Sequence, residues 1–98
     1  MSSLTADQVA LQLDTLPNWQ QDGNSLIKTY QFADFATAMA FIMRVAFYAE
    51  SLEHYPTWEN YFNTVKVRIG DAKQGAVQSR DVQLAKRMES AAAGFTAQ

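Results

Sequence analysis

Apolar residues recur along this chain with two different spacings, and the changes between them divide the sequence into predicted helices and strands. Thr5-Ala-Asp-Gln8 has the pattern of a capping box and predicts a short helix that ends before Pro17. The buried side of this first helix is predicted to include Val9, Leu13 and Leu16. Asp22-Gly23-Asn24 then predicts a hairpin turn between two strands.

Strand-like alternation occurs in two hairpins, one on each side of a long helical segment. The run 26–32 places apolar side chains on one face, with Lys28 as the exception. These apolar residues are Leu26, Tyr30 and Phe32. The runs 58–62 and 64–69 predict a second hairpin around Asn63. In its second strand the inward residues are Val65, Val67 and Ile69, and the outward ones are Lys66 and Arg68.

Helical spacing recurs in the middle of the chain and again at its end. Asp34 is a suitable N-cap for a helix over roughly 34–53, in which Met39 and Met43 are predicted to fill the core. The apolar stripe of this helix consists of Phe35, Ala38, Ile42, Val45, Ala49 and Leu52. After a polar loop at 70–78, Ser79 or Asp81 can open a last helix. Its predicted buried side consists of Val82, Ala85, Met88, Ala92 and Phe95.

The order of these elements is helix, two strands, long helix, two strands and helix. This order is typical of an α+β domain, with a four-stranded antiparallel sheet and three helices packed on one face. At 98 residues, of which 48% are hydrophobic, the chain has the size and apolar content of one folded domain over 1–98. No internal repeat or linker divides the sequence.

Charge and composition exclude several classes of function. A net charge of −2 gives no general attraction to nucleic acid, and the chain has no cysteine for a disulfide or thiolate metal site. No apolar run is predicted to span a membrane, and the absence of an export signal predicts a cytoplasmic protein. Residues 61–98 hold six of the eight basic residues. Lys66 and Arg68 are therefore candidates for binding an acidic partner, although such a bias more often reflects a solvated face or self-association.

His54 is the only histidine and is the first candidate for acid–base chemistry near neutral pH. Pro56 disfavours helical geometry at the residue before it, so the long helix should end close to His54. Glu50 lies four residues earlier, on the same helical face, where its carboxylate could orient the imidazole. A surface ion pair stabilised by the helix dipole is the simpler alternative. With one histidine and no cysteine, the sequence predicts no metal site and no cofactor.

Over about residues 19–90 the sequence resembles the pterin-4a-carbinolamine dehydratase family. The segments that carry the resemblance are residues 30–35, 41–46 and 49–50. The family signature has an acidic residue, a histidine, a proline, an aromatic residue and a distal aspartate at fixed spacing. Glu50, His54, Pro56, Phe62 and Asp81 occupy those five positions without a gap. The resemblance implies the α+β fold already predicted from the pattern.

The resemblance also implies a pterin pocket, in which family members place three histidines. Here the second position is Tyr55 and the third is Ala72, so only His54 matches. The family reaction removes water from a 4a-hydroxytetrahydropterin and needs a base for a ring N–H proton and an acid for the hydroxyl. The pocket residues that the resemblance implies are Glu53, His54, Tyr55, Gly70, Asp71, Ala72 and Lys73.

Two functions follow from this match. The first, which the loss of two histidines favours, is a non-catalytic binding or assembly factor. Some family members act as dimerisation cofactors of a transcription factor, and divergent relatives are implicated in Rubisco assembly in carboxysomes. The resemblance therefore implies a homodimer or larger assembly, with Rubisco as an example of a protein partner and a possible carboxysome association. The second function is a working or weak dehydratase that uses His54 and recycles tetrahydrobiopterin.

Overall fold

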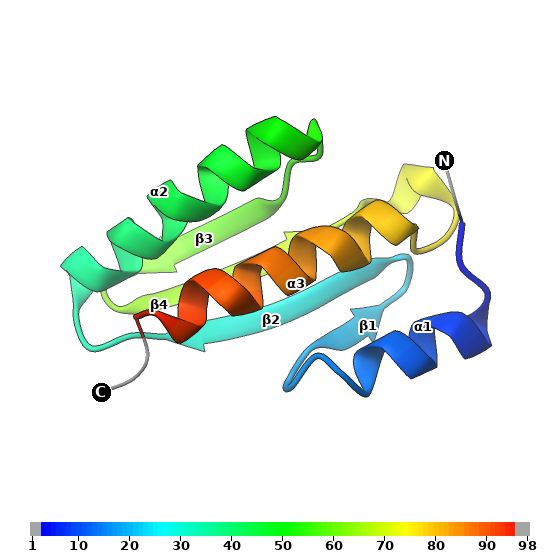
Figure 1. Ribbon diagram of the computed structural model, residues 1–98, viewed down its shortest axis with the longest axis horizontal. Coiled ribbons are helices and arrows are strands. Elements are labelled where there is room, and N and C mark those ends of the chain that lie inside the picture. The colour runs from blue at the N-terminus through cyan, green and yellow to red at the C-terminus, as the bar shows by residue number, and fades with distance from the viewer. Residues whose placement is uncertain (1–2, 96–98) are drawn as a thin grey trace.

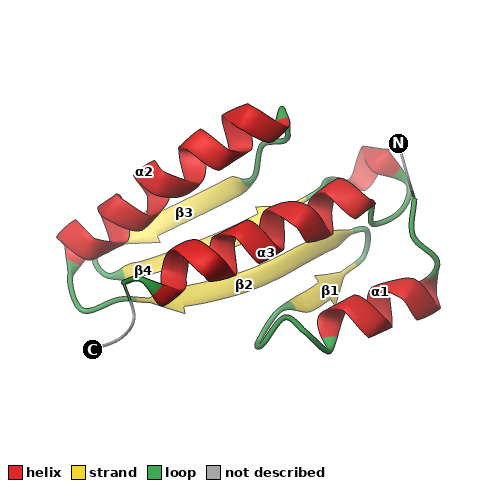
Figure 2. Ribbon diagram, in the orientation of Figure 1, coloured by secondary structure: helices red, strands yellow, loops and turns green. Residues whose placement is uncertain are grey.

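The computed structural model describes residues 3–95 and has the predicted α+β architecture (Figures 1 and 2). Two strand pairs alternate with three α-helices and one short 3₁₀-helix. In chain order the elements are α1 (Ala6–Leu13), β1 (Gln20–Asp22), β2 (Ser25–Gln31), α2 (Phe35–Leu52), β3 (Thr57–Tyr61), β4 (Thr64–Ile69), η1 (Ala72–Gln74) and α3 (Ser79–Ala93). The predicted capping box at Thr5 and the N-cap at Asp34 are both present.

The four strands form one antiparallel sheet in the order β1-β2-β4-β3. Each hairpin closes with a two-residue turn, because Asp22 pairs with Ser25 and Tyr61 pairs with Thr64. Gly23 begins the first turn at a φ of 61°, a conformation that glycine adopts without steric cost. In the second turn Phe62 has a positive φ, so β3 ends one residue earlier than the sequence predicted.

The core lies between the sheet and the helices α2 and α3, which run across one of its faces (Figure 1). The alternation predicted for β4 is confirmed, since Val65, Val67 and Ile69 are buried and the two residues between them are exposed. Tyr30, Phe32 and Phe41 pack their rings together at the junction of β2 and α2. The opposite face of the sheet is not covered by any described helix.

Lys28, the exception to the apolar pattern of β2, belongs to a polar cluster at the edge of the core. Its ammonium donates to Glu89 Oε2 of α3 at 2.6 Å, and the same oxygen accepts from Tyr30 OH at 2.5 Å and Trp19 Nε1 at 2.9 Å. Burial raises the pKa of Glu89, but these three hydrogen bonds outweigh burial and leave the pKa below its ordinary value. A charged residue is therefore tolerated on the inner face of β2 because α3 supplies its partner.

Two expectations for α2 are wrong. Phe35 is 50% exposed and Met43 is 61% exposed, although both were expected to be buried. The residues of α2 that are buried are Ala38, Phe41, Val45 and Ala49. Phe35 lies on the predicted stripe but is the first residue of α2, whereas Met43 lies on a second apolar side of the helix that does not enter the core. Phe47, at 70% exposed, belongs to the outer side.

Among the described residues, α2 is the one helix long and apolar enough to cross a membrane by length and composition. The burial of Phe41 and Val45 in the core accounts for part of that composition. The core helix of a soluble protein passes the same test, so the expectation that the chain spans no membrane stays a prediction.

Replacing Glu89 tests the polar cluster. At pH 7, Glu89→Gln should lower the free energy of unfolding by about 2 kcal/mol, because hydrogen bonds to a charged group contribute ~1.5–3 kcal/mol. The pKa of Glu89 is lower in the folded protein, so its stabilising effect is complete above the unfolded pKa and is lost as the pH falls through the folded one. Urea unfolding should show the two proteins converging as the pH falls below about 4.

Glu59→Gln is the matched control, because Glu59 is exposed on β3, on the far side of the sheet from this cluster. It should change the unfolding free energy by less than ~0.5 kcal/mol. An equal cost of Glu89→Gln at pH 7 and at pH 3.5 would show that the charge of Glu89 does not stabilise the fold.

Candidate functional site

The end of α2 places His54 by a local turn, at the position that Pro56 predicted. Glu53 has a left-handed conformation with a φ of 53°, and its N–H donates to Glu50 O at 3.1 Å. The N–H of His54 donates to Ala49 O at 3.1 Å. These two bonds form a Schellman motif, which usually has glycine at the left-handed position. A glutamate there is strained, and such strain persists where the surrounding structure holds the turn in place.

Asp81 of α3 holds the imidazole of His54. His54 Nε2 lies 2.5 Å from Asp81 Oδ1, and the exposed fractions of the two side chains are 12% and 0%. In the neutral imidazole this contact favours the tautomer in which Nε2–H donates to the carboxylate and the lone pair lies on Nδ1. An imidazole oriented in this way can accept a proton at a defined atom.

The carboxylate of Asp81 also accepts two further hydrogen bonds, both at Oδ2. Gln74 Nε2 donates at 2.6 Å and the backbone N–H of Gln78 donates at 2.8 Å. Gln78 is the N-cap of α3, so Asp81 satisfies one of the free N–H groups at that end of the helix. Asp81 has a place in the family signature, but its burial and its contact with His54 were not predicted from the sequence.

A hollow of about 240 Å³ lies beside this pair. It is lined by Glu53, His54, Tyr55, Thr57, Arg68, Gly70, Asp71 and Gln74. Five of the seven residues implied by the resemblance are in this lining. Lys73 is not, and the side chain of Ala72 lies outside the described residues.

Glu50 was expected to orient His54, and the structure corrects this expectation. The Glu50 carboxylate accepts from Tyr55 OH at 3.3 Å, and the carboxylate that contacts His54 belongs to Asp81. Four-residue spacing brings Glu50 near the start of the turn, but the left-handed Glu53 ends the helix before His54 and so changes the direction of the histidine. Slight desolvation and the neighbouring Glu50 raise the pKa of Tyr55, so its phenol is a donor rather than a base near neutral pH.

The sequence did not identify Thr57 and Gln74 as residues that line this hollow. It identified Arg68 only as a candidate for binding an acidic partner. Gln74 was missed because its role depends on tertiary contacts: its amide also donates to Asn24 O at 3.1 Å. Gly70 permits this contact, because a Cβ there would lie 2.6 Å from Gln74 Nε2, and its φ of 92° also favours glycine. Gly70 in a loop was the one signal in the sequence for such a close approach.

Lys66 and Arg68 lie on the uncovered face of the sheet, as predicted. The structure adds acidic residues to that face: Arg68 pairs with Asp22 at 2.6 Å, and Glu59 lies opposite Lys66 on β3. The binding of an acidic partner by these two residues stays a prediction. No group of three or more His, Cys, Asp or Glu side chains within residues 3–95 has the arrangement of a metal site.

Residues 2–91 match the model of a family described as Pterin 4 alpha carbinolamine dehydratase. Two similar relatives are named "Putative pterin-4-alpha-carbinolamine dehydratase". The protein of Synechococcus sp. (strain WH7803) is 39% identical over 79% of this chain and 83% of its own length. The protein of Afipia carboxidovorans is 36% identical over 97% of this chain and 98% of its own length.

Two solved structures resemble the fold. A transcriptional coactivator/pterin dehydratase from Brucella melitensis has a TM-score of 0.87 and 31% identity, over 93% of this chain and 99% of that one. A pterin dehydratase-like protein described as a RuBisCO assembly factor in the alpha-carboxysome has a TM-score of 0.62 and 21% identity, over 76% of this chain and 86% of that one. The second likeness is one of fold alone.

The contact between His54 and Asp81 can be tested by nitrogen-15 NMR, because a single histidine gives unambiguous ring signals. At pH 8.5 the wild-type protein should show the proton on Nε2 and the lone pair on Nδ1. Asp81→Asn should produce a mixture of tautomers and lower the unfolding free energy by about 2 kcal/mol, since buried donors lose their acceptor. Circular dichroism checks that this variant is folded during the measurement.

Glu50→Gln is the control for this experiment, since it removes the other carboxylate that the sequence offered to His54. It should leave the tautomer unchanged. A shift with Glu50→Gln and none with Asp81→Asn would reverse the assignment of the orienting residue.

Proposed function

Since the chain belongs to the pterin-4a-carbinolamine dehydratase family, we propose that it binds a pterin ring in the hollow beside His54 and dehydrates a 4a-hydroxytetrahydropterin slowly. The observation that carries this proposal is the 2.5 Å contact between His54 and the buried Asp81. A buried carboxylate costs several kcal/mol unless donors surround it. That arrangement beside a hollow supports a working acid–base group more than an assembly role alone.

In the proposed reaction, Nδ1 of His54 accepts the proton from N5 of the pterin. The electron pair of the N5–H bond forms the C4a=N5 double bond as the C4a–OH bond breaks. The hydroxyl takes a proton from solvent and leaves as water, and His54 later returns its proton to solvent. Asp81 holds the imidazole ring of His54 during this step and stabilises the positive charge that develops on the imidazole. Tyr55 lines the same hollow and can donate a hydrogen bond to the leaving hydroxyl.

The reaction should be slow because one histidine is present where relatives of this family use three. Each positioned acid or base contributes roughly 10²- to 10⁴-fold in rate. A phenol is a weaker acid than an imidazolium, and the raised pKa of Tyr55 increases this difference. Binding of the ring depends on shape and hydrogen bonds in the hollow, so we propose that it is better preserved than catalysis.

A dehydration assay beside a fluorescence titration with dihydrobiopterin tests this function. His54→Gln should lower the rate by about 10²-fold or more, with less than a tenfold change in the Kd for dihydrobiopterin. Tyr55→His combined with Ala72→His should raise the rate above that of the wild type. Glu50→Gln is the control and should change the rate by less than about threefold.

If the protein binds dihydrobiopterin but shows no turnover that depends on His54, the proposed catalysis is wrong and only the proposed pterin binding stands. No binding of dihydrobiopterin at millimolar concentration would contradict the proposed function altogether.

A second candidate function is protein binding through the outer side of α2. Met43 and Phe47 are more than half exposed there, Ala36 and Ala40 are exposed on the same side, and Phe35 is half exposed beside them at the first position of the helix. This apolar surface, defined by these five residues, has no partner within the described chain. Exposed apolar patches mark association sites. We propose that a second copy of the chain covers it, and that an assembly role of the kind described for one structural neighbour uses the same surface.

Sedimentation velocity tests the association. The wild type should sediment at micromolar concentration as a dimer or larger species, above the 11.0 kDa of the single chain. Met43→Lys with Phe47→Glu should shift the population to the single chain, because two charges cannot be buried in an apolar interface without partners. Leu11→Lys is the matched control, since Leu11 is 67% exposed on α1. A wild type that remains a single chain would contradict the proposal.

A further inference from the structure

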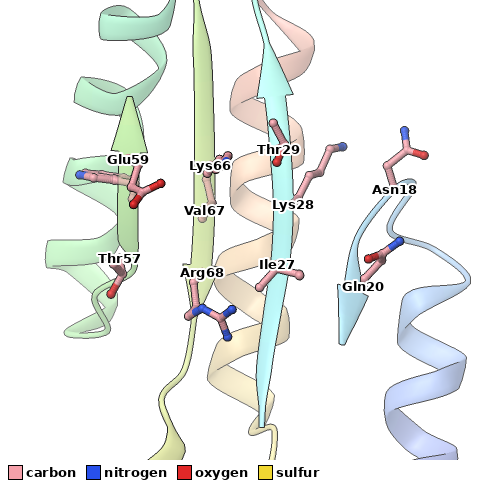
Figure 3. Close-up of a pocket in the computed structure, with 11 residues that line it drawn as sticks. Asn18, Gln20, Ile27, Lys28, Thr29, Thr57, Glu59, Lys66, Val67 and Arg68 are labelled. Carbon is pink, nitrogen blue, oxygen red and sulfur yellow. The ribbon is translucent and has the colours of Figure 1, made fainter. Parts of the chain in front are cut away.

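A second and larger hollow, of about 510 Å³, lies on the uncovered face of the sheet (Figure 3). It shares two residues, Thr57 and Arg68, with the hollow beside His54. The smaller hollow is below the ~300–1,000 Å³ that is usual for sites that enclose a ligand. A pterin ring bound in the smaller hollow therefore has its substituents outside that hollow. Because Thr57 and Arg68 line both hollows, a substituent that extends past Arg68 enters the larger hollow.

The register of the strands places side chains in two rows across the larger hollow. Arg68 lies between Thr57 on β3 and Ile27 on β2, and Lys66 lies between Glu59 and Thr29. Figure 3 shows the Arg68 side chain extending from β4 toward β2. Arg68 and Lys66 are two residues apart on one strand, so they are about 7 Å apart on the same face. Two cations at this distance can flank one phosphate group.

Both cations are available to a ligand. The side chain of Lys66 is exposed and has no hydrogen bond or ion pair with any other residue of the described range 3–95. Arg68 is 43% exposed and its partner Asp22 is 58% exposed, so their ion pair is of the surface kind, which contributes little to stability. The guanidinium has five N–H donors, more than one carboxylate can satisfy.

The remaining polar groups suit a hydroxylated chain. Thr29 and Thr57 offer hydroxyls that donate or accept, and the carboxylate of Glu59 accepts. The sequence of groups along β4, starting from the ring hollow at Gly70, is Arg68 and then Lys66. A ligand that fits this order has a flat ring, then hydroxyls, then an anion.

We propose that the two hollows form one groove for a pterin whose side chain carries hydroxyls and ends in a phosphate. The ring lies beside His54, and Arg68 and Lys66 bind the phosphate. This inference rests on the proposed function, because it takes the ring site from there. It assigns to Arg68 and Lys66 the recognition of a small anionic ligand in place of an acidic protein.

Fluorescence titrations with neopterin and neopterin 3′-monophosphate, which share ring and hydroxyls, test the groove. The wild type should bind the phosphate form about tenfold more tightly. Lys66→Gln should remove most of this preference and leave the Kd of neopterin unchanged, because Lys66 lies outside the ring hollow. Arg68→Gln should also remove most of the preference, and because Arg68 lines the ring hollow as well, only the ratio of the two Kd values is compared for this variant. Asp22→Asn should increase the preference, because it removes the carboxylate that competes for Arg68. Lys86→Gln, which removes a charge on α3 outside both hollows, should change nothing.

Each outcome decides between the two proposals. Equal affinity for the two ligands, or a preference that survives both Arg68→Gln and Lys66→Gln, would overturn the phosphate site and leave the ring site intact. Failure of the wild type to bind either ligand would overturn the proposed function, and the groove with it.

Discussion

The buried carboxylate of Asp81 connects segments that are far apart in the sequence, and the candidate site depends on it. One side chain at the start of α3 accepts from the imidazole after α2, from the amide of Gln74 in η1 and from the backbone N–H of Gln78. Gln74 extends the network to the turn of the first hairpin through Asn24 O. A carboxylate with three donors is stable in the protein interior, whereas removal of one donor exposes the cost of burying it.

The strained turn at Glu53 fits this picture. The N–H of His54 is fixed by Ala49 O and its ring by Asp81, so both ends of the histidine are held. Arg80 Nη1 also donates to Glu53 O at 3.4 Å, which adds a contact from α3 to the same turn. Contacts on both sides of Glu53 therefore keep it in its left-handed conformation. Because of this turn, His54 lines the hollow.

The sequence predicted the fold well because the fold follows from local periodicity. Alternation in β4, the hairpin turn at Gly23 and the N-cap at Asp34 are properties of neighbouring residues, and all three are confirmed. The two errors on α2 have different origins. Phe35 belongs to the stripe that is buried, but it is the first residue of the helix and stays half exposed. Met43 lies on a second apolar side, and periodicity does not show which side meets the sheet. That choice depends on where the whole helix lies.

The site was predicted less completely, for the same reason. His54 and Tyr55 could be identified from spacing and resemblance, but the partner of His54 lies 27 residues away and not on the same helix. Glu50 was preferred because it is close in sequence. Thr57 and Gln74 give no signal of their own, since a threonine in a strand and a glutamine in a loop are common everywhere.

The two faces of β4 are under different constraints, and these constraints determine which substitutions the protein tolerates during evolution. Its inward residues, such as Val67, are buried against the helices, so replacing them endangers folding. Its outward residues, Lys66 and Arg68, are exposed on the uncovered face, where most substitutions alter stability by less than ~0.5 kcal/mol. Because side chains alternate between the two faces of a strand, single substitutions of Lys66 or Arg68 can change the proposed ligand preference without changing the buried residues that hold the scaffold.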